Sequence, residues 1–281
     1  MAPSVFQALG WGMALVALGT GCQRKEIPRP DQRPNAVTVQ SVGAEPRLKL
    51  RYRYRAGESL TYRITSHREI SGLPRPAGPV AVTLSVFTDR VRGRRARLRW
   101  RVERVASGSA RLQGLDLWVE TSDRGEISTV SRGRPRPRSR PRPKPSGQVQ
   151  QSVRRLYLAW PAEAVGPGAW WIQRRDVILA PSTHGGFRAR VAARYRFDRV
   201  APCGRGRCAH LSMRLTMDLS HKAGLVKVRG KGRGSGRVVF DLERGRLLES
   251  HTRAVIGLST SLMPNKVVQR LSLNQSMVMT R

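Results

Sequence analysis

Strict alternation of apolar and charged residues is the feature that most restricts how this chain can fold. In RARLRWRVERV (95–105), for example, Leu98, Trp100 and Val102 alternate with arginines. The same period of two recurs in LKLRYRYR (48–55), FRARVAARYRFDRV (187–200), HLSMRLTMDLS (210–220) and VVQRLSLNQSMVM (267–279). Alternation over eight or more residues is typical of half-buried antiparallel strands. The sequence therefore predicts a large, strongly twisted antiparallel sheet.

A glycine-rich stretch, VKVRGKGRGSGRVVF (226–240), first suggests a phosphate-binding loop. Such a loop needs Gly-Lys followed by Ser or Thr at the start of a helix, but here Gly230-Lys231 is followed by Gly232. The stretch also keeps the period of two, with glycine at the positions where neighbouring segments carry apolar residues. A curved strand is the interpretation we prefer, with a flexible loop and a phosphate site as the alternatives.

One helix is expected over residues 148–160, because Val149, Val153, Leu156, Tyr157 and Trp160 recur at helical spacing. A Pro- and Arg-rich insertion precedes it at residues 132–147, where alternating Pro and Arg favour a solvated, disordered chain. The expected fold class is mainly β (α+β): one β-rich domain over residues 48–281, built as a large curved antiparallel sheet or half-barrel with one packed helix.

The N-terminal segment resembles the lipobox signal of bacterial lipoproteins. A short apolar run ends in Gly19-Thr20-Gly21-Cys22, and a charged, Pro-rich stretch follows. The resemblance implies a signal peptide over residues 1–21, lipidation of Cys22, and a flexible tether over residues 22–46. The alternatives are an ordinary secretory signal and a buried helix that carries a cysteine by chance. In the lipoproteins that this segment resembles, Asp after the cysteine usually signals retention in the inner membrane, so Gln23 at that position implies the outer membrane. The resemblance thus implies a lipid-anchored protein of the cell envelope, on the periplasmic side or at the cell surface.

The other two cysteines, Cys203 and Cys208, lie in APCGRGRCAH between two alternating segments. Their spacing suits a disulfide across a short hairpin, and an exported protein would keep it oxidised. Free thiols and a metal site are the alternatives, although a zinc centre needs four ligands and only His210 is near. We also expect the segments 187–200 and 208–219 to pair as neighbouring strands.

The charge is strongly positive: 53 Lys and Arg stand against 18 Asp and Glu, a net charge of +35. Such a chain should attract anionic polysaccharides, anionic lipid headgroups or other polyanions. We expect no specific binding to nucleic acid. A bias of the coding sequence toward arginine is the alternative. The candidate anion-binding residues are Arg134, Arg136, Arg138, Arg140, Arg142, Lys227, Arg229, Lys231 and Arg233.

Two further stretches, WPAEAVGPGAWW (160–171) and GSGRVVFDLERGRLLES (234–250), resemble a broad, poorly characterised group of β-rich lipoproteins of Gram-negative envelopes. The resemblance implies an extracytoplasmic lipoprotein and brings no catalytic residues. We expect Trp170 and Trp171 to pack in the core or at a sheet edge rather than to stack on a sugar.

No catalytic, metal-binding or cofactor-binding pattern stands out, and we predict that the protein is not an enzyme. The five histidines lack a metal-binding spacing, and no nucleophile elbow is present. The denser carboxylates are expected to balance nearby arginines; they are Asp116, Glu120, Asp123, Glu126, Asp241 and Glu243. The preferred function is a structural or binding module with a cationic sheet face. The alternative is a periplasmic carrier that holds a hydrophobic or lipid ligand between helix and sheet. A lined cavity would favour the carrier, and a filled core with a continuous arginine face would favour the binding module.

Overall fold

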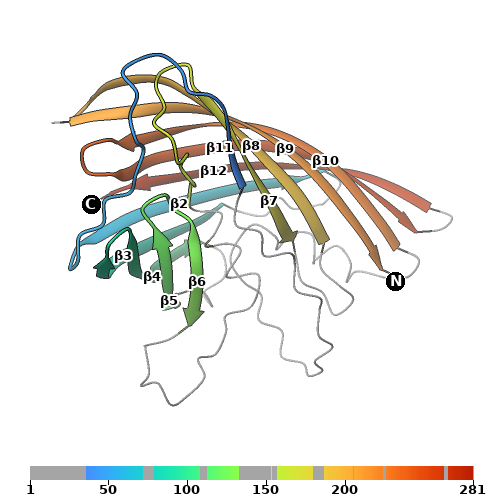
Figure 1. Ribbon diagram of the computed structural model, residues 1–281. Coiled ribbons are helices and arrows are strands. Elements are labelled where there is room, and N and C mark those ends of the chain that lie inside the picture. The colour runs from blue at the N-terminus through green and yellow to red at the C-terminus, as the bar shows by residue number, and fades with distance from the viewer. Residues whose placement is uncertain are drawn as a thin grey trace.

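The structure is a computed structural model that describes residues 36–71, 79–107, 113–132, 153, 157–179, 187–204, 206–223, 226–262 and 265–280. These residues form one antiparallel sheet of twelve strands in the order β1-β7-β8-β9-β10-β11-β12-β2-β3-β4-β5-β6. The strands are β1 (Ala36–Ser41), β2 (Ser59–Ile70), β3 (Val80–Arg92), β4 (Arg95–Ser107), β5 (Asp116–Ser122), β6 (Ile127–Arg132), β7 (Trp170–Leu179), β8 (Phe187–Cys203), β9 (Gly206–Ala223), β10 (Val226–Asp241), β11 (Arg246–Leu262) and β12 (Asn265–Met279). The sheet is strongly curved, so that β3–β6 lie beneath the long strands β8–β12 in the view of Figure 1. The predicted large curved antiparallel sheet is therefore present, with β1 and β6 at its two edges.

Alternation along the long strands separates an inner face, which carries the core, from an outer face that is largely exposed. Across β9, β10, β11 and β12 the register places one inner row as Met217, Gly232, Ile256 and Leu271. The buried residues of the inner face form a large apolar cluster and a smaller one near the far ends of β8–β12. The period of two in the sequence thus reports which side chains enter the core.

The glycine-rich stretch is a strand, as predicted, because it is continuous with β10 and pairs with both β9 and β11. Its glycines lie on the inner face, where neighbouring strands approach closely. A Cβ atom added at Gly236 would lie 2.3 Å from the carbonyl oxygen of His251, and one at Gly232 would lie 2.9 Å from a side-chain carbon of Ile256. Glycine therefore permits the close approach of β10 and β11, and the phosphate-loop alternative does not apply.

The α+β prediction with one packed helix is wrong. Among the described residues only Val153 has a helical backbone, and the fold is all-β. Of the expected helix, residues 148–152 and 154–156 lie outside the described residues, and the part that follows is not helical. Tyr157, Leu158, Ala159 and Trp160 are consecutive and all buried, which a helix packed by one face on a sheet would not achieve.

Two extended segments occupy the place expected for the helix, and we call residues 48–55 and 157–166 together the inner strap. They contact each other through the bridge between Leu48 and Val165, with N–H···O distances of 2.8 and 3.0 Å. The backbone N–H of Tyr52 donates to the carbonyl of Asp123 at 2.7 Å, which ties the strap to the β5–β6 turn. The expected strand over residues 48–55 is thus extended and keeps its alternating burial, but it joins no strand ladder.

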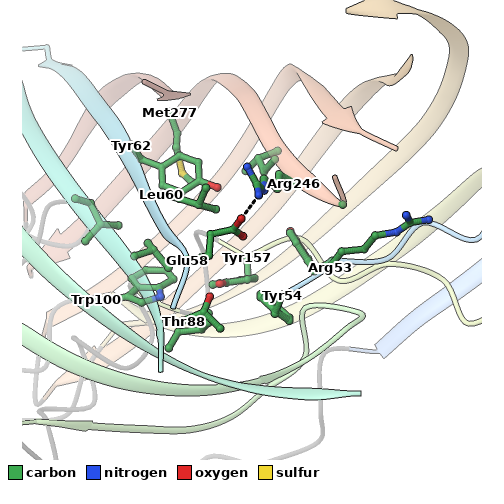
Figure 2. Close-up of a pocket in the computed structure, with 16 residues that line it drawn as sticks. Arg53, Tyr54, Glu58, Leu60, Tyr62, Thr88, Trp100, Tyr157, Arg246 and Met277 are labelled. Carbon is green, nitrogen blue, oxygen red and sulfur yellow. Dashed lines mark hydrogen bonds and ion pairs between the residues drawn. The ribbon is translucent and has the colours of Figure 1, made fainter. Parts of the chain in front are cut away.

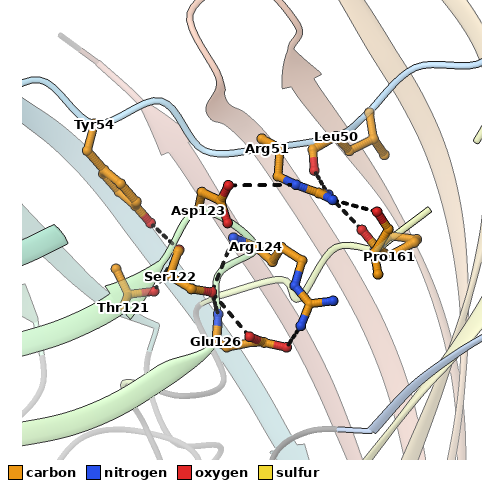
Figure 3. A network of polar contacts seen from close by, with 10 residues as sticks. Leu50, Arg51, Tyr54, Thr121, Ser122, Asp123, Arg124, Glu126 and Pro161 are labelled. Atoms are coloured by element: carbon orange, nitrogen blue, oxygen red, sulfur yellow. Dashed lines mark hydrogen bonds and ion pairs between the residues drawn. The ribbon is translucent and has the colours of Figure 1, made fainter. Parts of the chain in front are cut away.

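Arg51 links the two halves of the inner strap (Figure 3). Its guanidinium donates to the carbonyl oxygens of Pro161 and Ala162, both at 2.6 Å, and lies 3.8 Å from the carboxylate of Asp123. Partial burial lowers the pKa of Arg51 below the usual arginine value, while the charge of Asp123 opposes that shift. The arginine therefore serves the fold rather than the exposed cationic surface.

The N-terminal region departs from the expected boundaries in one respect. Residues 22–46 were expected to be a flexible tether, but Ala36–Ser41 forms β1 and pairs with β7. The signal peptide, Cys22 and the start of the tether lie outside the described residues, as does the Pro- and Arg-rich insertion after Arg132. No helix in the described part of the chain is long and apolar enough to cross a membrane.

Candidate anion-binding face

The carrier alternative would place a hydrophobic ligand on the inner face. A cavity of only about 40 Å³ lies between the strap and strands β2–β4, next to the turn before β11. Tyr62, Trp100, Tyr157 and Met277 surround it (Figure 2). Ligand pockets usually measure about 300–1,000 Å³, so this cavity is too small for a lipid chain.

An ion pair and several tyrosines complete the packing around this cavity. Glu58 and Arg246 form a salt bridge whose side chains are 18% and 15% exposed (Figure 2). The ring of Tyr52 packs edge-on against Tyr157 and Phe240, with ring centroids 5.3 and 5.5 Å apart. Burial raises the pKa of Tyr52 and Tyr157 well above the usual tyrosine value. This part of the inner face is a filled core.

The outer face carries the charge. Lys227, Arg229, Lys231 and Arg233, four of the predicted anion-binding residues, are all exposed on the outer side of β10. The five other candidates, between Arg134 and Arg142, lie outside the described residues. Other exposed arginines of β7–β10 share this face, and they are Arg174, Arg190, Arg194, Arg196, Arg214 and Arg237. We call this surface of β7–β10 the cationic face.

Few carboxylates offset the cationic face. Asp176, Asp198 and Asp218 are the exposed ones on β7–β10 within the described residues. Asp218 lies directly opposite both Arg190 and Lys231, whereas Arg194 lies directly opposite Arg214. Like charges opposite each other in a sheet are destabilising. The face therefore holds positive charge that no nearby described acid balances.

Elsewhere the carboxylates do pair with arginines, as expected. Asp116 accepts from Arg99 at 2.6 Å, and Glu126 pairs with Arg124 (Figure 3). Asp241 instead accepts from the backbone N–H groups of the next turn, at 2.8 and 2.9 Å.

The two tryptophans of WPAEAVGPGAWW have different surroundings. Trp171 is fully buried in the core, with its ring 5.8 Å from that of Tyr195. Trp170 lies half-buried on the outer face, where the guanidinium of Arg194 stacks on its ring at 3.9 Å from the centroid. The stacking holds Arg194 in place at the border of the cationic face.

A groove of about 860 Å³ lies beside the cationic face, where β10, β11, β12 and β2 run together. The side chains that line it form two cross-strand rows on the outer face. The register gives the first row as Ser235, Arg253, Asn274 and His67. The second row, two residues along each strand, is Arg237, His251, Ser276 and Thr65. We call this feature the cross-strand groove.

Sequence analysis missed the residues of the cross-strand groove. Apart from Pro79, they come from four strand segments between residues 65 and 276, and each segment contributes three consecutive residues, of which two face outward. No local motif links them, because only the strand register brings them together. The one available signal was that His67, His251, Arg237 and Arg253 occupy alternate, outward-facing positions within their segments.

The cysteine pair agrees with the predicted hairpin. β8 and β9 are antiparallel neighbours, and Cys203 and Cys208 lie at disulfide distance, with Cα atoms 5.7 Å apart. Gly204 has a positive φ of 57°, as a tight turn requires. In the described part of the chain, no three His, Cys, Asp or Glu side chains lie close enough together to hold a metal ion.

Comparison with known proteins gives little guidance. No protein-family model matches the chain, and no curated protein matches it significantly. One solved structure from Bacteroides fragilis, described as "a putative exported protein with YmcC-like fold", matches with 10% sequence identity and a TM-score of 0.33. The match covers 83% of this chain and 98% of that one. A score this low does not establish a common fold, so the match carries no information on activity.

Proposed function

We propose that this protein is a non-enzymatic binding module of the bacterial envelope, anchored through a lipid on Cys22, whose cationic face binds anionic polymers or headgroups. The observation that carries the proposal is the unbalanced charge of the face. Arg194 opposes Arg214, and neither Arg229 nor Arg233 has a carboxylate among its directly opposite partners. A bound polyanion would relieve this repulsion and release its own counterions.

The envelope location rests on the sequence and on the cysteine pair. The lipobox-like segment ending in Cys22 supports export and anchoring. Cys203 and Cys208, placed at disulfide distance, suit an oxidising compartment. We prefer the outer membrane because Gln23, and not the Asp that usually signals inner-membrane retention in similar lipoproteins, follows the cysteine.

The carrier alternative has less support. It requires a cavity on the inner face, and the described cavity there is about 40 Å³ and closed in by aromatic rings. The inner strap covers this part of the sheet in the place of the expected helix. A lipid-binding assay in which an acyl-chain fluorophore binds with micromolar affinity would restore the carrier proposal.

Salt dependence tests the binding function. We expect purified full-length protein in mild detergent to bind dextran sulfate with an affinity that falls steeply as NaCl rises. Substituting glutamine for Lys227, Arg229, Lys231 and Arg233 together should reduce the slope of log affinity against log salt by about 3 to 4, since each lost contact removes about one.

A matched control removes the same charge from a different part of the molecule. Arg90, Arg92, Arg95 and Arg104 are exposed cations of β3 and β4. Their glutamine variant should keep the wild-type slope. Equal losses in the two variants would mean that net charge, and not the cationic face, governs binding.

The anchor has its own test. Wild-type protein should fractionate with membranes and partition into detergent, whereas Cys22→Ala should stay unprocessed or be released. Unchanged size and fractionation of the variant would contradict lipidation at Cys22.

A further inference from the structure

The cross-strand groove is bounded by two regular rows of outward side chains. Opposite residues on neighbouring strands have Cβ atoms about 5 Å apart, and residues two apart along a strand are separated by about 7 Å. The two rows therefore run parallel across four strands, about 7 Å apart. Such a channel is narrow enough for one extended chain or one small headgroup to contact both rows at once.

Charge in the groove is concentrated on two arginines. Arg237 lies directly opposite His251, and Arg253 lies two residues farther along the same strand as that histidine. Diagonal partners of this kind have Cβ atoms about 7–8 Å apart. Long guanidinium side chains at this separation can converge on one tetrahedral anion placed between the rows.

The carboxylates next to the groove hold some of its side chains but leave one cation unpaired. Glu249 accepts from Arg237 at 3.1 Å and also pairs with His251. Glu69 lies 3.1 Å from His67. Arg253 is exposed and makes no ion pair with any carboxylate in the described part of the chain. The groove thus contains side chains held in place by carboxylates, and the guanidinium of Arg253 is available to bind an anion.

Hydroxyl and amide groups supply the rest of the lining. Thr65 and Ser276 share a hydrogen bond of 2.6 Å and keep further capacity, since each hydroxyl can donate once and accept twice. Ser235 and Asn274 flank Arg253 on its two neighbouring strands. Apart from Pro79 and Gly236, the described residues that line the groove have polar side chains, which favours a hydrophilic ligand.

We infer that the cross-strand groove binds a phosphate ester that carries hydroxyl groups, of the sugar phosphate or glycerol phosphate class, with the phosphate between Arg237 and Arg253. A phosphate offers oxygens on several sides and so can accept from guanidiniums on both rows, whereas a carboxylate presents one edge. The ligand's hydroxyl groups would meet Ser235, Asn274 and the histidines. The inference rests on the proposed function, because it names the anion that one part of the outer face selects.

Calorimetric titration of full-length protein in mild detergent with glucose 1-phosphate tests the site. We expect binding, with glucose and glucuronate at least about tenfold weaker, because charge-assisted hydrogen bonds to phosphate are lost. Arg253→Ala should lose about tenfold or more in affinity, and Arg253→Lys should recover only part of it, since lysine cannot bind in a bidentate manner.

Arg229→Ala is the matched control, since it removes an exposed arginine of β10 that does not line the groove. It should leave glucose 1-phosphate affinity unchanged while weakening dextran sulfate binding. Equal effects of the two alanine variants on glucose 1-phosphate would overturn the site. So would equal affinity for glucuronate, or binding to phosphatidylglycerol vesicles without any to glucose 1-phosphate.

The two proposals fail separately. If the cationic-face variant and the β3–β4 control variant bind dextran sulfate alike, while glucose 1-phosphate binding still depends on Arg253, the cationic face is rejected and the groove is kept. Salt-dependent dextran sulfate binding with no glucose 1-phosphate binding would reject the groove and keep the face.

Discussion

Replacing Gly236 by alanine tests the close approach of β10 and β11 that accompanies the curvature of the sheet. A Cβ atom at this position would lie 2.3 Å from the carbonyl oxygen of His251 and 2.7 Å from the methyl carbon of Met213. Real Cβ atoms essentially never approach another heavy atom within 3.0 Å. The methionine end can swing away, but the carbonyl belongs to the backbone of β11, so the two strands would have to move apart.

The expected loss of stability follows from two opposing effects. Overpacking a core usually costs about 1–3 kcal/mol, and a clash with backbone belongs at the upper end of that range. Alanine offsets about 0.4–1 kcal/mol by reducing the conformational entropy of the unfolded chain. We therefore expect Gly236→Ala to lower the free energy of unfolding by about 2 kcal/mol.

Gly257→Ala provides the control, because Gly257 lies on the adjacent strand with its Cβ position directed outward. The only atom near that position is the carbonyl oxygen of Lys231, at 3.9 Å. This variant should be unchanged or more stable by up to about 1 kcal/mol. The two glycine variants should thus differ by about 2–3 kcal/mol.

Equilibrium urea unfolding followed by tryptophan fluorescence measures both variants. A lower midpoint at an unchanged slope for Gly236→Ala would indicate a loss of native-state stability. If Gly236→Ala proves as stable as Gly257→Ala, the glycines are not needed for the approach of β10 and β11, and the explanation of the glycine-rich strand is wrong.

Two further predictions concern the filled core. Glu58→Gln should destabilise the protein by about 2 kcal/mol in urea unfolding, because it leaves the largely buried Arg246 without its partner; this value lies between those of exposed and fully buried pairs. Glu243→Gln, which removes an exposed ion pair, should cost less than about 0.5 kcal/mol, and equal effects of the two variants would refute a special role for the Glu58–Arg246 pair. Stability should also fall as pH rises above about 10, because tyrosines of the unfolded chain lose their protons there while burial raises the pKa of Tyr52 and Tyr157 and keeps them protonated. The unfolded state then binds fewer protons than the folded state, and Tyr157→Phe should reduce the pH slope of the urea midpoint; an unchanged slope would argue against this source of the pH dependence.

Local sequence was sufficient for the strands that alternate most strictly and for which side each of their residues faces. In segments such as 187–200 and 210–220 the side chains alternate with a period of two, and a pleated strand places alternate side chains on opposite faces. The hairpin of β8 and β9 was equally accessible, because its partners are adjacent in the chain and Gly204 marks the turn. The glycine-rich strand was predicted from the same period of two.

The same local pattern could not tell a strand from an extended segment without a ladder. Residues 48–55 alternate as cleanly as β8 does, yet they cross the inner face as part of the strap. Likewise Tyr157 and Trp160 have helical spacing, but their burial comes from contacts with distant rings, including those of Tyr52 and Phe240. Periodicity measures which side chains are apolar, and it does not identify what covers them.

The sequence by itself therefore determined that this protein is a β-rich, strongly cationic chain, and which face of the strictly alternating strands carries the charge. Only the tertiary structure decided that β12 pairs with β2 and that a groove crosses four strands, with Arg237 and Arg253 on opposite rows. The physical reason is register. Hydrogen bonds between strands far apart in the chain select which outward side chains become neighbours, and that choice leaves no trace in any single segment.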